Sequence, residues 1–269
     1  PPPPIVSDDL FRRLSSGSPP AGARFRPLDI ASEPVGPGAV FGIDAEFVAL
    51  SPPEKEVLPD GREHVIRPSR LGLARVSVVR GGGRLKGVPC FDDYVRAVEP
   101  VYDYLTRFSG LVHGDLDPAA SKHHIVQLKA AYLKLRYLVD RGAVFVGHGL
   151  KKDFRMINLV VPPAQVIDTV ELFHFKRQRN LSLRYLAGYL LGVDIQGTTH
   201  DSIEDASTAV QLHECYLALS EQGTFEQCLL DLYKYGKQNG WEVTPELVAV
   251  GEANRAQREA ARKGGTGAG

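Results

Sequence analysis

The sequence is poor in cysteine and has no long hydrophobic run. Its 269 residues include three cysteines, none of them in a C-x-x-C pair. An odd number of cysteines without this spacing argues against a disulfide framework and against a zinc knuckle. No apolar run reaches the roughly 18 residues that a membrane helix requires, and no signal peptide opens the chain. We therefore expect a cytoplasmic protein in a reducing compartment, without a membrane segment.

The chain also has no net charge, because 32 Lys and Arg residues balance 32 Asp and Glu residues. The strong positive field of many nucleic-acid-binding proteins is therefore not expected for the whole chain. This balance does not exclude a nuclease. An acidic metal site needs basic residues elsewhere to hold phosphates, and the two contributions cancel in the sum.

Composition divides the chain into four segments. Residues 1–38 are dense in Pro, Gly and Ser, which predicts an N-terminal arm or linker, and the opening P-P-P-P suggests a fragment of a longer polypeptide. Residues 39–222 carry the strand and helix patterns of a folded domain, and residues 223–250 predict a helical extension. Residues 251–269, rich in Ala, Gly and Arg, are expected to form a frayed helix and a flexible tail.

The order of these patterns predicts an α/β fold. Apolar residues at 39–50 indicate a buried central strand, and β-branched residues at 71–80 and 88–98 indicate two antiparallel neighbours. Helical spacing begins near Ser121, and strand and helix patterns then alternate, which implies parallel additions to the same sheet. We predict a ribonuclease H-like mixed sheet of about five strands flanked by helices.

Four acids and one histidine occur in three local patterns. Asp44 and Glu46 lie in F-G-I-D-A-E-F, Asp153 in G-H-G-L-K-K-D-F, and His200 and Asp205 in H-D-S-I-E-D-A. Residues two apart in a strand point to the same face, so the first two acids can meet one site. Four carboxylates in one pocket would repel each other without cations, and the pattern therefore predicts a two-metal site. The histidine is the candidate base that activates water.

The donor atoms determine which metal we expect. All four acids offer hard carboxylate oxygens, and no cysteine or second histidine accompanies them. Two Mg²⁺ ions are therefore expected, and Mn²⁺ should substitute. One ion would lower the pKa of a bound water while the other stabilises the leaving oxygen.

The three motifs resemble those of the DEDDh exonucleases, the histidine-containing branch of the DnaQ-like family, in order and spacing over about residues 39–222. The segment D-T-V-E-L-F-H-F-K-R-Q-R-N-L-S-L-R-Y-L-A-G-Y-L-L-G at 168–192 is similar to a narrower group, the catalytic subunit of the Pan-type poly(A)-nuclease deadenylase. The resemblance implies a poly(A)-specific 3′–5′ exoribonuclease that shortens mRNA tails and releases AMP. It also implies a pseudokinase-containing partner subunit that acts through the full-length chain.

The resemblance further suggests contacts to poly(A) RNA. The peptide L-T-R-F-S-G-L at 105–111 is similar to a T-R-x-S-G segment of related RNA exonucleases, which makes Arg107 and Ser109 candidates near the terminal nucleotide. Phe47 and Val48 occupy the positions that in the family pack beside the terminal ribose and base. Basic residues that could hold phosphates, or form only a solvated face, are Lys151, Lys152, Lys176, Arg177 and Arg179.

Two other functions stay open from the sequence. A general RNA or DNA 3′–5′ exonuclease would use the same five residues, because no base-reading code is visible. A noncatalytic module that binds RNA or a partner is the second alternative, although it has no need for four mutually repelling carboxylates. We interpret His148 as a structural residue in a tight turn, and His113, His123 and His124 as a surface cluster without zinc.

Overall fold

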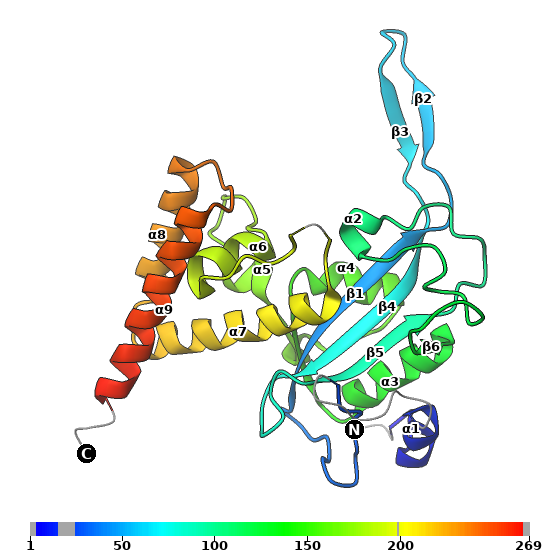
Figure 1. Ribbon diagram of the computed structural model, residues 1–269, viewed down its shortest axis with the longest axis horizontal. Coiled ribbons are helices and arrows are strands. Elements are labelled where there is room, and N and C mark those ends of the chain that lie inside the picture. The colour runs from blue at the N-terminus through cyan, green and yellow to red at the C-terminus, as the bar shows by residue number, and fades with distance from the viewer. Residues whose placement is uncertain (1–3, 16–24, 198, 266–269) are drawn as a thin grey trace.

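A six-stranded mixed sheet forms the centre of the protein (Figure 1). The computed structural model describes residues 4–15, 25–197 and 199–265. The strand order is β6-β5-β4-β1-β7-β8. These strands are β1 Val40–Ala49, β4 Leu71–Arg80, β5 Pro89–Val95, β6 Ile125–Val126, β7 Val144–Gly147 and β8 Val166–Asp168. The predicted α/β class with a mixed sheet is confirmed.

The central strand is β1, as the sequence indicated. It pairs antiparallel with β4 and parallel with β7, and β4 pairs antiparallel with β5. Asp44 lies opposite Ser77 and Glu46 lies opposite Arg75, and the register shifts directly after Glu46. The short strand β6 was not predicted, because Ile125 fits the helical spacing that continues into the following helix.

Helices cover both faces of the sheet. They are α1 Asp8–Ser15, α2 Thr106–Ser109, α3 Leu128–Asp140, α4 Leu150–Ile157, α5 Thr169–Leu172, α6 Leu183–Leu186, α7 Ser202–Glu221, α8 Phe225–Gln238 and α9 Pro245–Gly265, with the short helical segments η1 Pro163–Gln165 and η2 Ala187–Leu191. Phe41, Ile43 and Ala45 of β1 share one buried cluster with α3 and α4. The opposite face lies against α7, where Ala206 and Val210 share a second buried cluster with strands β4 and β7.

Gly42 permits the close approach of α7. A Cβ atom at this position would lie 2.6 Å from the carbonyl oxygen of Ala206, so a side chain would push the helix away. Because Asp44 and Glu46 follow Gly42 at steps of two, they point to the same face. The first turn of α7 is thereby brought over the two acids of β1.

The N-terminal residues that we expected to be an arm or linker pack in part against the core. Helix α1 lies beside α3, where the Phe11 ring stacks on Tyr137 with centroids 4.1 Å apart. Arg80, which is 1% exposed, donates to both carboxylate oxygens of Glu33. Both an aromatic and an acidic residue of this segment, Phe11 and Glu33, therefore contact the sheet domain.

A two-stranded hairpin, β2 Glu54–Val57 and β3 Glu63–Arg67, projects from the sheet (Figure 1). The sequence did not predict it. All residues of both strands are exposed, so they carry no pattern of alternating burial. Its turn has a recognisable signal, P-D-G, in which Gly61 has φ +81°.

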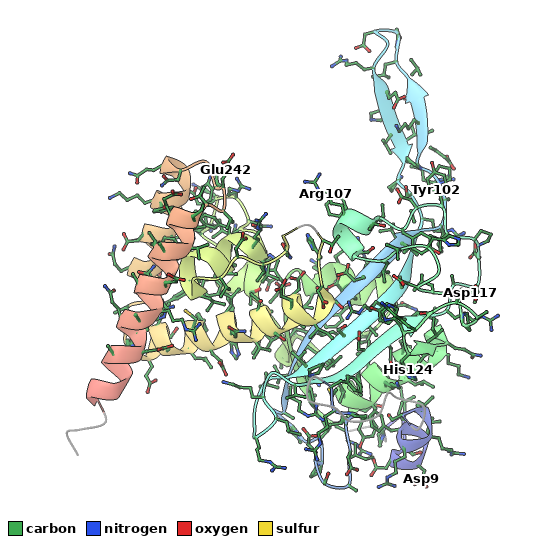
Figure 2. All side chains as sticks on the ribbon, viewed as in Figure 1. Asp9, Tyr102, Arg107, Asp117, His124 and Glu242 are labelled. Atoms are coloured by element: carbon green, nitrogen blue, oxygen red, sulfur yellow. The ribbon has the colours of Figure 1, made fainter. Side chains whose placement is uncertain are left out.

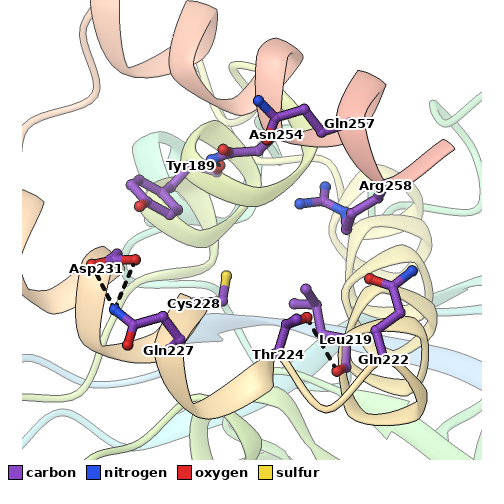
Figure 3. Close-up of a pocket in the computed structure, with 10 residues that line it drawn as sticks. All are labelled: Tyr189, Leu219, Gln222, Thr224, Gln227, Cys228, Asp231, Asn254, Gln257 and Arg258. Carbon is purple, nitrogen blue, oxygen red and sulfur yellow. Dashed lines mark hydrogen bonds between the residues drawn. The ribbon is translucent and has the colours of Figure 1, made fainter. Parts of the chain in front are cut away.

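The C-terminal helices pack against η2 and the end of α7 (Figure 1). Helix α9 extends to Gly265, so the helix predicted at the start of segment 251–269 runs through most of it, and residues 266–269 lie outside the described part. Asn254 Nδ2 donates to the Tyr189 carbonyl oxygen at 3.2 Å, and Arg258 donates to that of Leu190. A cavity of about 380 Å³ lies between these elements, and four of the ten residues drawn around it in Figure 3 carry amide side chains. Helix-favouring Ala, Glu and Arg residues and these contacts explain the longer helix.

None of the helices in the described part of the chain combines the length and apolarity needed to cross a membrane.

Candidate active site

The five residues of the three sequence patterns line one cavity of about 430 Å³. Its lining consists of Asp44, Ala45, Glu46, Phe47, Leu71, Leu105, Phe108, Ser109, Lys152, Asp153, His200 and Asp205. Three segments that are far apart in the sequence contribute the acids. Strand β1 carries two of them, helix α4 the third, and the first turn of α7 the fourth.

A polar network fixes the N-terminus of α7 against the sheet. Asp201 caps the helix by accepting a hydrogen bond from the Ile203 amide at 2.9 Å. The hydroxyl groups of Ser77 and Ser202 lie 2.6 Å apart, and Arg75 Nη1 lies 3.6 Å from Asp201 Oδ1. Strand β4 therefore determines where the first turn of α7 begins.

Asp205 is 5% exposed, and its two oxygens differ in their surroundings. Oδ2 accepts a hydrogen bond from Gln196 Nε2 at 2.8 Å and lies 3.5 Å from His200 Nδ1. Oδ1 is buried and has no hydrogen-bond partner among the described residues. A buried carboxylate oxygen without a partner is costly unless something binds it.

The turn before α4 positions Asp153. Gly149 begins this helix with φ +81°, and its N–H donates to Asp168 Oδ1 at 2.8 Å. The same oxygen accepts from the Val170 amide and caps α5. Asp168 thus connects the ends of β7 and β8 and holds the start of the helix that carries Asp153.

Burial and nearby negative charges raise the pKa of all four acids in the cavity. The pKa of Asp44 lies well above 3.8, mainly because of burial and then because of the charges of Glu46, Asp205 and Asp153. Burial is also the largest cause for the other three, whose values rise to about 8 for Glu46, about 7 for Asp153 and about 6 for Asp205. These acids therefore resist carrying four negative charges together.

The oxygen atoms of the four carboxylates are suitable ligands for divalent cations. Hard carboxylate oxygens are the ligands that Mg²⁺ and Mn²⁺ prefer, and the orphan Asp205 Oδ1 offers an unused lone pair. A cation would also relieve the repulsion that raises the pKa of Asp44. Within the described ranges, no three His, Cys, Asp or Glu side chains stand close enough to hold one ion as they are placed. Binding would therefore require the carboxylates to draw together.

His200 lies in the loop before α7 and is partly exposed, with 33% of its side-chain surface accessible. Burial, and next the positive charge of Arg184, lower its pKa below the ordinary value of 6.5. The ring is therefore neutral near pH 7, the state in which imidazole accepts a proton. The Phe108 ring meets it edge-on, with centroids 6.3 Å apart.

Two of the four predicted substrate-binding residues line the cavity and two do not. Phe47 and Ser109 line the cavity. Val48 does not line it, because its side chain is buried in a separate cluster with Ala74 and Leu111. Arg107 is also absent from the lining and projects outward from α2 (Figure 2). The Ser109 hydroxyl is engaged in the loop itself, where it donates to the Tyr104 carbonyl oxygen at 2.6 Å.

Sequence reasoning missed Phe108, Leu71 and Leu105, which form part of the cavity wall. Phe108 is 61% exposed, and a large aromatic residue inside the T-R-F-S-G peptide was the available signal. Of the five predicted phosphate-binding residues, Lys152 lines the cavity. Arg179 instead lies over the Trp241 ring at 4.9 Å.

The other histidines lie in structural surroundings. His148 Nδ1 is 2.9 Å from Thr169 Oγ1, which agrees with a structural role in the turn. His123 stacks on Tyr94 with ring centroids 3.9 Å apart, and His124 Nε2 lies 3.7 Å from Asp93.

Comparisons with known proteins agree with this geometry. The family model RNase_T, described as an exonuclease, matches residues 41–213. The chain is 52% identical over 230 residues to the PAN2-PAN3 deadenylation complex catalytic subunit pan2 of Schizosaccharomyces pombe, which covers 85% of this chain and 21% of that protein. It is 52% identical over 210 residues to the corresponding subunit of Homo sapiens, which covers 77% of this chain and 18% of that protein. The chain thus spans about a fifth of the length of these curated relatives.

Solved structures give the same result. The Saccharomyces cerevisiae Pan2 pseudoubiquitin hydrolase-RNA exonuclease module in complex with A7 RNA superposes with a TM-score of 0.76 at 40% identity, over 89% of this chain and 37% of that one. The Neurospora crassa Pan2 catalytic unit, with protease and nuclease domains, superposes with a TM-score of 0.70 at 42% identity, over 84% of this chain and 36% of that one.

Proposed function

This chain belongs to the RNase T exonuclease family, and from this membership we propose that it is a poly(A)-specific 3′–5′ exoribonuclease that releases AMP from mRNA tails. One observation carries the proposal: four acids and a histidine from three distant segments line a single cavity. The adenine preference rests on similarity to proteins named as deadenylation catalytic subunits and to a module solved with A7 RNA.

We assign the metal ligands to the four acids of the cavity, Asp44, Glu46, Asp153 and Asp205. The family implies dependence on divalent metal, and we propose two Mg²⁺ ions, with Mn²⁺ as a substitute. When bound, such ions lower the pKa of water and stabilise a leaving oxyanion. The four carboxylates would hold them, and Asp44 is the acid whose pKa the charges of all three others raise.

His200 acts as the general base in this proposal. Its Nδ1 faces Asp205, which leaves Nε2 to accept the proton of the attacking water. The oxygen of that water forms the new bond to the terminal phosphorus, and the bond to the 3′ oxygen of the preceding nucleotide breaks. Asp205 then lies close enough to stabilise the imidazolium.

Apolar side chains of the cavity form the proposed site for the terminal nucleotide. Phe47, Leu71, Leu105 and Phe108 offer surfaces for a base and a ribose, and Lys152 offers a charge for a phosphate. Aromatic stacking tolerates every base. This apolar lining therefore also favours a second candidate, a general 3′–5′ exonuclease whose adenine selectivity resides outside this chain.

We further propose that the chain acts in the cytoplasm together with a partner subunit. The relatives are named as catalytic subunits of PAN2-PAN3 complexes, which supports such an assembly. A pseudokinase-containing partner is the type that the sequence resemblance implies.

A magnesium-dependent time course on 5′-labelled RNAs of equal length, one all adenosine and one mixed, tests the function. Asp44→Ala removes a proposed ligand, and Glu226→Ala, an exposed acid on α8, is the matched control. We expect a ladder that shortens from the 3′ end of the all-adenosine RNA for the unaltered chain and the control. Equal shortening of both RNAs would support the general exonuclease, and cleavage of neither would contradict both enzymatic functions.

A further inference from the structure

We propose that Gln196 is a positioning residue that fixes both Asp205 and the loop that carries His200, an inference that rests on the proposed function. Gln196 belongs to none of the three sequence motifs. It lies between Ile195, which is buried in the core cluster of the C-terminal helices, and the loop that leads into α7.

Two hydrogen bonds connect Gln196 to the first turn of α7. Its side chain Nε2 donates to Asp205 Oδ2 at 2.8 Å, and its backbone N–H donates to Glu204 Oε2 at 3.3 Å. The side-chain bond is a charge-assisted one whenever Asp205 is ionised, which makes it stronger than a neutral contact. Gln196 therefore contacts two consecutive acids of the helix from one position.

The bond to Asp205 determines which of its oxygens is available. Oδ2 is engaged by Gln196, whereas Oδ1 is buried without a partner among the described residues. Holding one oxygen fixes the rotation of the carboxylate and keeps the other one open for a cation. Hydrogen bonds that orient a metal-binding carboxylate commonly raise its affinity for the metal.

The same contacts close the loop that carries His200. The loop begins at Gln196 and ends at the helix turn containing Glu204 and Asp205, so the bonds join its two ends. From the other side the loop lies against α2, because a Cβ atom at Gly110 would be 2.5 Å from the His200 carbonyl oxygen. His200 is thus held between two fixed points.

The backbone of Gln196 supports a role for its side chain. Its φ is +56°, a left-handed conformation that glycine adopts freely and that most other residues avoid. The structure thus retains a strained residue where glycine would fit, and the side-chain amide is the feature that glycine lacks. Strain of this kind is typically kept at functional positions.

The experiment measures metal binding by the 269-residue chain without RNA. Mn²⁺ is titrated into metal-free protein by calorimetry for the unaltered chain, Gln196→Met and Gln196→Gly. Gln196→Met keeps the shape of the side chain without its donor, and Gln196→Gly removes the backbone strain together with the amide. Gln211→Met, at an exposed position farther along α7, is the matched control.

We expect both Gln196 variants to bind Mn²⁺ about 10- to 100-fold more weakly than the control. In EDTA, Gln196→Gly should unfold at a temperature no lower than the unaltered chain. Affinity equal to that of the control in both variants would overturn the inference. The readout is separate from RNA cleavage: weaker metal binding by the variants combined with no hydrolysis by the unaltered chain would sustain the role of Gln196 and contradict the proposed exonuclease.

Discussion

At the scale of single residues, the candidate site is a group of acids whose ionisation is unfavourable where they stand. Burial is the largest cause of the raised pKa at all four positions, and nearby negative charges add to it at each of them. The charge of Arg75 lowers the pKa of the two acids of β1. Its Nε donates a hydrogen bond to Asp92 Oδ1 at 2.7 Å. The residues that would bind cations therefore make the metal-free fold less stable.

Glu46→Gln should stabilise the metal-free protein at alkaline pH. The pKa of Glu46 is about 8 in the fold, against an ordinary value of 4.5, so between these values the folded state holds a proton that the unfolded state has released. Stability conferred by this group is therefore present below pH 4.5 and is lost as the pH rises towards 8. In EDTA at pH 8 we expect a gain of at least about 1 kcal/mol in the free energy of unfolding, and almost none at pH 4.5.

Denaturant unfolding of both proteins at the two pH values measures this difference. Glu226→Gln, an exposed acid, is the control. An equal change at both pH values would contradict the raised pKa.

His200→Ala should lower kcat roughly 10²- to 10⁴-fold and leave the fold intact, because the ring is partly exposed and supplies a proton acceptor. His213→Ala, on α7 but outside the cavity, serves as the control. Single-turnover kinetics at saturating RNA measure the effect. Full activity of His200→Ala would assign the base to another group.

At the scale of elements, the site depends on how closely α7 approaches β1. The apolar strands were predictable because burial leaves a local pattern in the sequence. The part of the cavity wall that α2 contributes could not be predicted. Leu105 adopts φ +51°, Phe108 is exposed, and no periodicity in the sequence encodes such a loop geometry. Val48 was assigned to the substrate because of its neighbours in sequence, although it follows the register shift after Glu46 and is buried with Ala74 and Leu111.

Gly42→Ala should displace α7 and with it Asp205. The added methyl group would lie 2.6 Å from the Ala206 carbonyl oxygen and 2.7 Å from a Val210 methyl group. We expect a loss of about 1–3 kcal/mol in the free energy of unfolding and a clear loss of exonuclease activity. Gly36→Ala is the matched control, because a Cβ there meets nothing within 4 Å. Unchanged stability of Gly42→Ala would contradict the close helix approach.

At the scale of the whole molecule, the exonuclease sheet and the C-terminal helices each have a buried apolar cluster of their own. The family resemblance inferred from three short motifs is confirmed, because each motif encodes chemistry that only a few residue types can perform. The domain boundaries were predicted from composition alone, and composition does not show which segments pack together. Leu229, Leu232 and Leu247 of α8 and α9 are buried against Tyr185 and its neighbours, so the predicted boundary at residue 222 crosses a core.

A chain truncated after residue 222 should therefore be unstable. Its loss of α8 and α9 would expose apolar residues of α6 and η2, including Leu186 and Leu190, which are both 0% exposed in the full structure. Exposed apolar surface of this size promotes aggregation. We expect poor recovery as a monomer in size-exclusion chromatography, compared with a chain that ends at residue 265. A truncated monomer with the same unfolding temperature would show that the two parts fold independently.

Product analysis on an all-adenosine RNA identifies both the end at which cleavage begins and the nucleotide that is released. The RNA is supplied either with a free 3′ hydroxyl group or with a blocked 3′ end, and nucleotides released in the presence of Mg²⁺ are identified by mass spectrometry. We expect 5′-AMP as the product from the free end, little release from the blocked end, and none with Asp44→Ala. Internal fragments from both RNAs, or AMP release that persists in Asp44→Ala, would contradict it.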